Sequence, residues 1–303
     1  MTTLASAKGL VLEKNCVYFK RFLEASTSTN IFDMAQNWGY KSTNGPHTWA
    51  VHYAEAAGQR QSPINIQTSD VTLDPRLSSR QLTWNWPKHT DDVTNTGYCW
   101  KAHVHGEGST LQGGPLKDTY QLEQYHCHWG VNDSIGSEHT VDGKSYAGEL
   151  HFVHWNTKYG SFGEALKHGD GLAVLGVFVE AGKEHGEANN LIRALNNIKF
   201  KDATVKFADN LELDPSKLMP SNEPRPYWTY LGSLTTPPCS ECVIWIVFKD
   251  PIQMSHEQLE AFRAMYCGDR DQCCAANEMS ECILTNFRPC LPRGDRCVRA
   301  SYS

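Results

Sequence analysis

The chain has 303 residues, of which 40% are hydrophobic, and this is enough for one large domain with a substantial core. Its formal net charge of −6 argues against nucleic acid or an anionic membrane surface as a partner. The sequence contains no run of about 18 apolar residues, so we expect no membrane span.

The first 37 residues are interpreted as an N-terminal extension, flexible or partly helical, ahead of a single domain at 38–303. Basic residues in the extension are offset by Glu13 and Glu24, and no long apolar core is present, which disfavours a secretory signal. A mitochondrial presequence should be rich in Arg and poor in acidic residues. A mitochondrial location is therefore the alternative to a cytoplasmic one.

The body of the chain is predicted to consist of many short strands separated by turns that contain Gly, Pro and Asn. The predicted strands are 81–86, 98–105, 120–129, 150–156, 172–180, 227–233 and 242–248. Short helices are predicted at 162–167, 189–198 and 256–264. Long helices that alternate with strands are missing, so the predicted fold class is strand-dominated α+β and not a doubly wound sheet.

The strand predicted at 120–129 carries two histidines at His-x-His spacing. Successive side chains of a strand alternate between faces, so Gln124, His126 and His128 share one face. A neighbouring strand carries His151. Three imidazoles can converge there, and three nitrogen ligands with a fourth position left to water are how a catalytic zinc is held.

The spacing alone is a weak indicator, because a histidine in a half-buried strand is more often a hydrogen-bonded core residue than a ligand. His103 and His105 have the same spacing, but Gly106 follows directly and no third histidine lies on a partner pattern. We interpret that second pair as the end of a strand at the surface.

The first pair is accompanied by several motifs in a fixed order. They are Trp38-Gly39-Tyr40, Gln61-Ser62-Pro63-Ile64, Gly113-Gly114-Pro115-Leu116, residues 136–142, His154-Trp155-Asn156, residues 171–176, residues 232–238 and Asn286-Phe287-Arg288-Pro289. From about residue 38 to its end, the chain therefore resembles the α-class carbonic anhydrases of the cytosolic or mitochondrial type. The resemblance implies a central, mostly antiparallel twisted sheet of about ten strands with short peripheral helices, and one zinc ion at the foot of a conical cleft.

The activity implied is reversible hydration of carbon dioxide to bicarbonate and a proton. By resemblance, the zinc ligands are His126, His128 and His151. Hydration at neutral pH needs hydroxide, and zinc supplies it by lowering the pKa of a water, for which this family is the known example. Neutral histidines leave zinc its full charge, which suits this chemistry.

A ligand histidine is usually oriented by a hydrogen bond from its other nitrogen. Gln124, Glu149 and the main-chain carbonyl of Asn286 match the family positions for that role, and Tyr40 matches a tyrosine of its water network. The alternative for Gln124 and Glu149 is an ordinary polar residue at a strand end.

Thr235 and Glu138 match the residues that aim the attacking hydroxide. A Thr hydroxyl that donates to a carboxylate must accept from its other neighbour, and this turns the hydroxide lone pair toward the substrate. Thr236 matches a position that helps to hold bicarbonate. The alternative, that Thr-Thr-Pro-Pro is only the entry to a turn, leaves Glu138 unexplained.

Carbon dioxide is apolar, so its pocket should be an apolar wall beside the metal. By resemblance, the wall consists of Val153, Val174, Leu234, Val243 and Trp245. Each of these is also a plausible core residue.

The chain departs from the family at Tyr98, where the fastest members have a histidine that carries the product proton away. Tyrosine has a pKa of about 10 and histidine of about 6.5, so Tyr98 should be a poor relay at neutral pH. His52 and His103 are possible substitutes. Lys101, where many relatives have a smaller polar residue, is expected to place a positive charge near the cleft mouth.

Eleven cysteines are present, six of them in the last 40 residues without a Cys-x-x-Cys pair among the six, so a structural zinc site there is poorly supported. Secreted relatives have a disulfide from the position of Cys239 to a cysteine just before the Gln-Ser-Pro motif. Residues 54–59 contain no cysteine, so that bridge cannot form. This favours a reducing compartment, and we expect a cytoplasmic monomer whose partners are small molecules.

Two other classes of function are considered. One is a catalytically silent binding module of the same fold, which is disfavoured because silent relatives have lost a zinc histidine and this chain has all three. The other is a thiol-rich protein for metal buffering or redox chemistry, which the C-terminal cysteines suggest. A single zinc that is lost when His126 is mutated would favour the enzyme over the thiol-rich protein, whereas several metals retained in that mutant would favour the thiol-rich protein.

Overall fold

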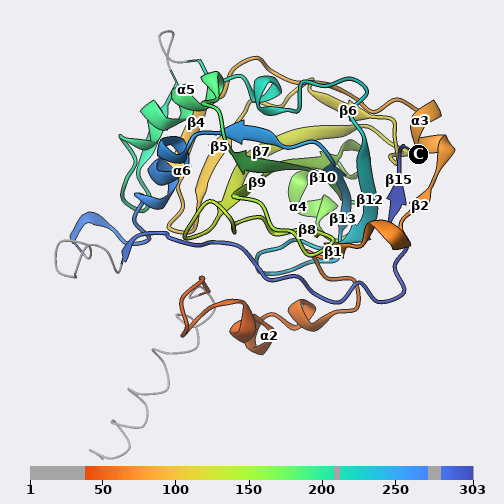
Figure 1. Ribbon diagram of the computed structural model, residues 1–303, viewed down its shortest axis with the longest axis horizontal. Coiled ribbons are helices and arrows are strands. Elements are labelled where there is room, and N and C mark those ends of the chain that lie inside the picture. Colours follow the sequence, from red (N-terminus) through yellow and green to blue (C-terminus); the bar gives the residue numbers. More distant parts are fainter. Residues whose placement is uncertain (1–37, 208–211, 272–280, 303) are drawn as a thin grey trace, which may run out of the picture.

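The computed structural model describes residues 38–207, 212–271 and 281–302. The N-terminal extension predicted at 1–37 lies outside these residues, and the division at residue 37 stays a prediction. Within them the strand-dominated fold class is confirmed: one large sheet forms the centre of the molecule, and the helices are short and peripheral (Figure 1).

The large sheet has 13 strands in the described residues, and ten of them form a continuous path in the order β11-β4-β5-β7-β9-β10-β13-β12-β15-β2. These strands are β11 Thr204–Lys206, β4 Asp92–Asn95, β5 Trp100–His103, β7 Tyr120–Trp129, β9 Gly148–Asn156, β10 Leu172–Ala181, β13 Val243–Phe248, β12 Tyr227–Gly232, β15 Arg299–Ala300 and β2 Thr72–Leu73. The strands β3 Thr83–Asn85, β6 Thr110–Gln112 and β14 Ile252–Met254 join from the sides. A second sheet pairs β1 Asn65–Ile66 with β8 Thr140–Val141.

Pairing in the large sheet is mostly antiparallel, as expected, and parallel only where β10 meets β13 and β14 and where β15 meets β2. The strand count exceeds the expected ten because several strands have only two to four residues. Of the predicted strands, 120–129 has the observed bounds of β7, whereas 98–105 shortens to the four residues of β5.

Each of the three predicted helices is present with shifted ends: α4 Phe162–Ala165, α5 Gly186–Leu195 and α6 His256–Arg263. The start of α6 is a capping box, in which Ser255 and Gln258 each bond the backbone N–H of the other. Sequence reasoning did not predict α2 Trp49–His52, α3 Pro75–Ser79 or the single-turn 3-10 helices η2 Pro46–Thr48, η3 Ala54–Ala57, η4 Thr68–Asp70, η5 Thr157–Tyr159 and η6 Pro215–Leu218.

The two faces of β7 differ in burial, and this difference positions the histidines. Tyr125 and Cys127 point into the larger hydrophobic core and are fully buried. Gln124 and His126 lie on the opposite face and are only partly buried. This second face is therefore partly accessible at Gln124 and His126, whereas His128 is buried further along it, and the two flanking strands hold the backbone.

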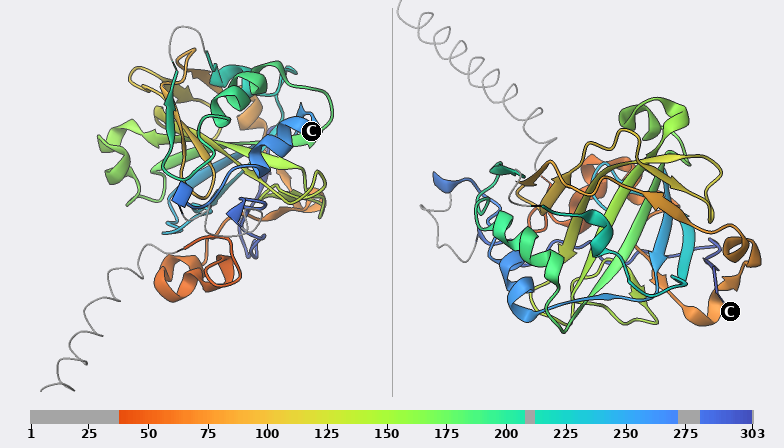
Figure 2. Two further views of the ribbon diagram at one scale, coloured as in Figure 1. Left: turned by 90° about the vertical axis from the view of Figure 1, so that its left-hand side faces the viewer. Right: turned by 90° about the horizontal axis from the view of Figure 1, so that it is seen from above.

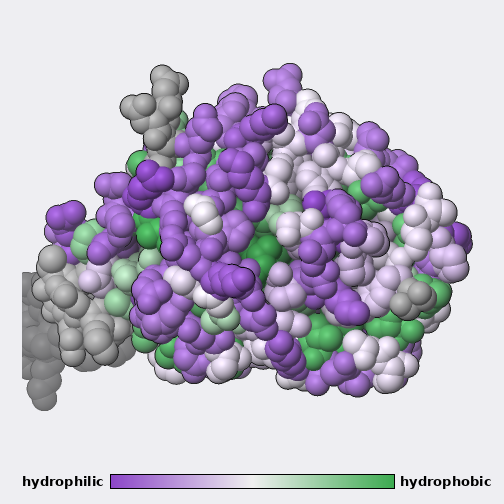
Figure 3. Space-filling model, turned by 45° about the horizontal axis from the view of Figure 1, so that its top comes forward, coloured by the Kyte–Doolittle hydropathy of each residue, from purple (hydrophilic) through white to green (hydrophobic). Residues whose placement is uncertain are grey.

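The segment that precedes the sheet, residues 38–60, lies against one side of the main body (Figures 1 and 2). Trp38 stacks on Tyr98 with ring centroids 4.1 Å apart, and the guanidinium of Arg288 lies 5.5 Å from the Trp49 ring centroid. The surface seen in Figure 3 is mostly hydrophilic, with hydrophobic side chains in small areas. Among the described residues, every helix is too short or too polar to cross a membrane.

Candidate metal centre

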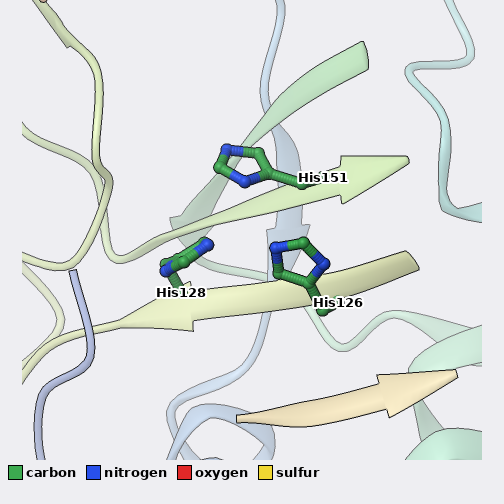
Figure 4. A group of neighbouring side chains, drawn as sticks. All are labelled: His126, His128 and His151. Atoms are coloured by element: carbon green, nitrogen blue, oxygen red, sulfur yellow. The ribbon is translucent and has the colours of Figure 1, made fainter. Parts of the chain in front are cut away.

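Three histidines meet on the accessible face of the sheet. His126 and His128 come from β7 and His151 from β9, and the antiparallel register places His126 directly opposite His151. Their rings face one another in Figure 4, with centroids between 4.7 and 5.3 Å apart. One nitrogen of each ring lies within 4.8 Å of the others, a spacing that a single ion can bridge.

The remaining nitrogen of each ring is held by a protein oxygen. The pairs are His126 Nδ1 with Gln124 Oε1 at 2.9 Å, His128 Nδ1 with the Asn286 carbonyl oxygen at 2.7 Å and His151 Nε2 with Glu149 Oε1 at 2.8 Å. All three partners are the ones expected from the sequence. Each contact fixes the orientation of one ring and leaves Nε2, Nε2 and Nδ1, respectively, for the shared centre.

The three rings fit a zinc ion. Nε2 of His128 is buried and has no hydrogen-bond partner, a costly arrangement for a polar atom unless something binds there. Burial lowers the pKa of all three imidazoles, that of His128 to about 4, so they are neutral near pH 7, the form that binds metal. Neutral nitrogen donors in threes are the donor set of catalytic zinc.

A second group that could hold a metal, formed by His139, Glu149 and His151, is explained by hydrogen bonds instead. Glu149 Oε1 accepts from both rings, at 2.7 Å from His139 Nδ1 and 2.8 Å from His151 Nε2. Its Oε2 accepts the backbone N–H groups of Glu138 and His139. Burial acts to raise the pKa of Glu149, but the two histidines hold it well below its usual range, so Glu149 is a carboxylate.

Glu138 lies directly beside the three rings, as the sequence motif suggested. Its Oε1 accepts the backbone N–H of Arg288 at 2.8 Å and lies 3.4 Å from His128 Nδ1. Burial raises the pKa of Glu138 to about 7, while its interactions with His151, Arg288 and Thr235 oppose that rise. The contact with Thr235 is loose, because Glu138 Oε2 has no partner of ordinary hydrogen-bond geometry.

Five apolar side chains predicted to form a wall belong to one hydrophobic cluster. Val174 pairs with Val153 on one side and with Trp245 on the other, so the three form a row across β9, β10 and β13. The Trp245 ring centroid lies 4.8 Å from that of His151. Leu234 and Val243 belong to the same cluster. The row therefore places apolar surface beside the three rings.

The tyrosines near the site are poor acids. Burial and the nearby charge of Glu138 raise the pKa of Tyr40 well above its usual value. Tyr98 lies outside β5, half-buried against Trp38, and burial raises its pKa too. Its main-chain oxygen accepts from Asn286 Nδ2 at 2.9 Å. Neither phenol is tuned to exchange protons near neutral pH.

The other histidines named in the sequence lie elsewhere. His52 is exposed at the end of α2. His103 Nδ1 bonds Asp92 Oδ1 at 2.7 Å, and His105, whose side chain is 86% exposed, bonds Asp91 at 3.1 Å. The pair is at the end of a strand, as predicted, and neither residue belongs to a possible metal group in the described part of the chain.

Sequence reasoning did not assign roles to His139, Tyr230 and Arg288. His139 Nε2 lies 2.6 Å from the Tyr230 hydroxyl, which donates to Ser62 Oγ at 2.9 Å, so Glu149 is supported by a buried chain of hydrogen bonds. Arg288 binds Glu138 through its main chain. His139 lies in the motif at residues 136–142 and Arg288 in the motif at 286–289, so their place in these motifs could have indicated a role.

The cysteines do not form a metal group among the described residues, because both groups that could hold an ion contain only His and Glu. Cys239 and Cys242 are buried free thiols, and burial raises the pKa of each. The C-terminal residues Cys273 and Cys274 lie outside the described residues.

Comparison with known proteins supports the same reading. The sequence profile of the eukaryotic-type carbonic anhydrases matches residues 44–302. Carbonic anhydrase 3 of Rattus norvegicus and of Mus musculus are each 44% identical over 271 residues, which cover 89% of this chain and 100% of each relative. Carbonic anhydrase 3 of Homo sapiens is 42% identical over 270 residues, with the same coverage.

Proposed function

This chain belongs to the eukaryotic-type carbonic anhydrase family, and we propose that it catalyses the zinc-dependent, reversible hydration of carbon dioxide to bicarbonate and a proton. The observation that carries the proposal is the partner set of the three histidines. Each ring has one nitrogen bound to a protein oxygen and the other left toward a common point. Such an arrangement is typical of histidines that ligate a metal.

His126, His128 and His151 would hold the zinc. When bound there, zinc acts as a Lewis acid that makes hydroxide available at neutral pH. Gln124, Glu149 and the Asn286 carbonyl group keep the rings in the required tautomers.

Thr235 and Glu138 would orient the nucleophile. A carboxylate beside Thr235 accepts a hydrogen bond from its hydroxyl group, so the hydroxyl oxygen must act as an acceptor toward the centre. Glu138 is fixed for this by the backbone of Arg288, and Thr235 is buried beside it. Thr236, the next residue, would donate to bicarbonate. The loose Thr235–Glu138 contact is expected to tighten when the site is filled.

The row of Val153, Val174 and Trp245 would hold carbon dioxide next to the histidines, with Leu234 and Val243 completing the wall. An apolar surface suits an uncharged substrate and keeps competing water away from it.

Proton release would be the slow step. Tyr98 is stacked on Trp38 and its pKa is raised by burial, so it would not carry a proton at neutral pH. Buffer molecules would then be the acceptor at high substrate concentration. His52 and His103 would be the substitute relays; His52 is exposed, and His103 is bound to Asp92 through its Nδ1 atom.

A cytoplasmic monomer is the proposed setting, with a mitochondrial location as the alternative. The buried free thiols of Cys239 and Cys242 and the 44% identity to carbonic anhydrase 3 support the cytoplasmic location. A catalytically silent binding module is the second candidate function, and the complete set of three histidines weighs against it.

Stopped-flow measurement of carbon dioxide hydration on protein of known zinc content tests the proposal. We expect fast, zinc-dependent hydration that rises strongly with added imidazole. Hydration indifferent to imidazole would keep the enzyme and transfer the relay to a residue such as His103. Full zinc occupancy without hydration would refute the proposed activity and leave the binding module.

A further inference from the structure

Lys101 occupies a position that the proposed chemistry does not use. On β5 it lies directly opposite His126 of β7, and on its other side it lies opposite Thr94 of β4. Directly opposite residues of an antiparallel pair share one face, with Cα atoms about 4.5–5.5 Å apart. The side chain of Lys101 therefore stands on the metal face of the sheet, next to a zinc ligand.

The ammonium group of Lys101 has no ion pair within the described residues, unlike those of Lys41, Lys144, Lys158, Lys167 and Lys217. Its position directly opposite His126 brings its charge to the strand next to the three rings. An unpaired cation beside a neutral donor set is available to a ligand.

The other charged groups near Lys101 on the sheet do not form an ion pair with it. Glu123 stands at the bulge of β7 between Leu122 and Gln124, and burial raises its pKa. His103 and Asp92 bind one another on the next row of the sheet. Lys206, opposite Asp92 on β11, lies two strands further from His126. Of Lys101 and Lys206, Lys101 is thus the cation nearer to the three rings.

We propose that Lys101 is the anion-attracting residue of the site: it draws bicarbonate, and small monovalent anions in general, to the metal centre. The inference rests on the proposed function, because bicarbonate is the charged partner of an uncharged substrate. A single ammonium group on the strand next to the three rings should strengthen anion binding about fivefold in a partly solvated site. It favours bicarbonate entry in the dehydration direction and slows its departure in the hydration direction.

The test measures dissociation constants of bicarbonate and of thiocyanate for the zinc-loaded protein, by isothermal titration calorimetry at low ionic strength. Lys101→Gln should weaken both about fivefold, whereas Lys101→Arg should stay near wild type because it keeps the charge. Lys144→Gln is the matched control, since it makes the same change of net charge at an ammonium paired with Glu180. Glu123→Gln should have the opposite effect and strengthen binding.

The salt dependence of anion affinity provides a second test. The difference between wild type and Lys101→Gln should shrink as ionic strength rises to about 0.5 M, since salt screens the charge. Equal affinities at low salt, or equal losses in Lys101→Arg and Lys101→Gln, would overturn the role. A protein that holds zinc and shows these shifts without hydrating carbon dioxide would refute the proposed function and keep this inference. Failure to bind zinc at all would overturn both.

Discussion

The two His-x-His pairs of this chain have the same spacing and different surroundings. His103 ends β5 and His105 lies two residues beyond it, and each bonds an aspartate, Asp92 or Asp91. In contrast, His126 and His128 both lie within the long strand β7, where uncharged oxygens, one from a glutamine side chain and one from a main-chain carbonyl, bind their Nδ1 atoms.

The difference shows what turns a pair of histidines into ligands. Burial lowers the pKa of both His126 and His128 and so keeps these two rings neutral and able to bind metal, whereas His103 and His105 lie nearer to solvent. The second requirement is a third ring, and only β7 has His151 opposite it on β9. Spacing is shared by both pairs, so environment and neighbours make the distinction.

Removal of one of the three converging histidines should have the largest effect. His128→Ala should lose tightly bound zinc and lower hydration by at least about 1,000-fold, because two remaining ligands do not hold a catalytic ion. The same change at His105 should leave zinc content at one per chain. Metal analysis of dialysed protein and stopped-flow assays measure both. Retention of zinc by His128→Ala would refute the ligand assignment.

Orientation should matter almost as much as the metal. Thr235→Val removes the hydroxyl group while keeping the shape, and we expect kcat/KM to fall about 100-fold with zinc retained. Glu138→Gln should give a similar loss. Because the two act as a unit, the double variant should be no worse than either single one. Additive losses would show that Thr235 and Glu138 work separately.

The residues that bind Nδ1 of His126 and of His103 allow a more direct comparison of the two pairs. Gln124→Ala frees Nδ1 of His126 and should weaken zinc binding about tenfold, since the ring loses its fixed orientation. Asp92→Ala frees Nδ1 of His103 in the same way and should leave zinc affinity unchanged. Competition with a chelator measures both constants. A loss of similar size in the two variants would point to general destabilisation instead.

The smallest effect concerns proton release. Tyr98→His should raise turnover several-fold in weak buffer and remove most of the stimulation by imidazole, because histidine titrates near the working pH. Tyr98→Phe should match wild type in both respects, since the phenol does not relay protons at neutral pH. A clear loss of turnover in Tyr98→Phe would show that the hydroxyl group takes part after all.

Prediction from sequence succeeded where a segment was long and chemically distinctive. β7, a ten-residue aromatic strand with turns on both sides, was predicted with its observed bounds, and its alternation placed Gln124, His126 and His128 correctly on one face. β4 and β11 were not predicted. They have only four and three residues, with polar side chains such as Asp92 and Thr94. β4 is a strand because β5 provides a partner, and β11 is a strand because β4 does.

The sequence was enough to predict which residues form the candidate site, because strand alternation and motif order are local properties of the chain. It predicted three histidines as zinc ligands and Gln124, Glu149 and the Asn286 carbonyl as their partners, and the structure brings these groups together. Only the tertiary structure decided which nitrogen of each ring is free, that Glu149 is shared between His139 and His151, and that Lys101 stands unpaired beside His126. These features depend on burial and on the register between strands that are distant in the sequence, so they arise only when the strands pair in the sheet.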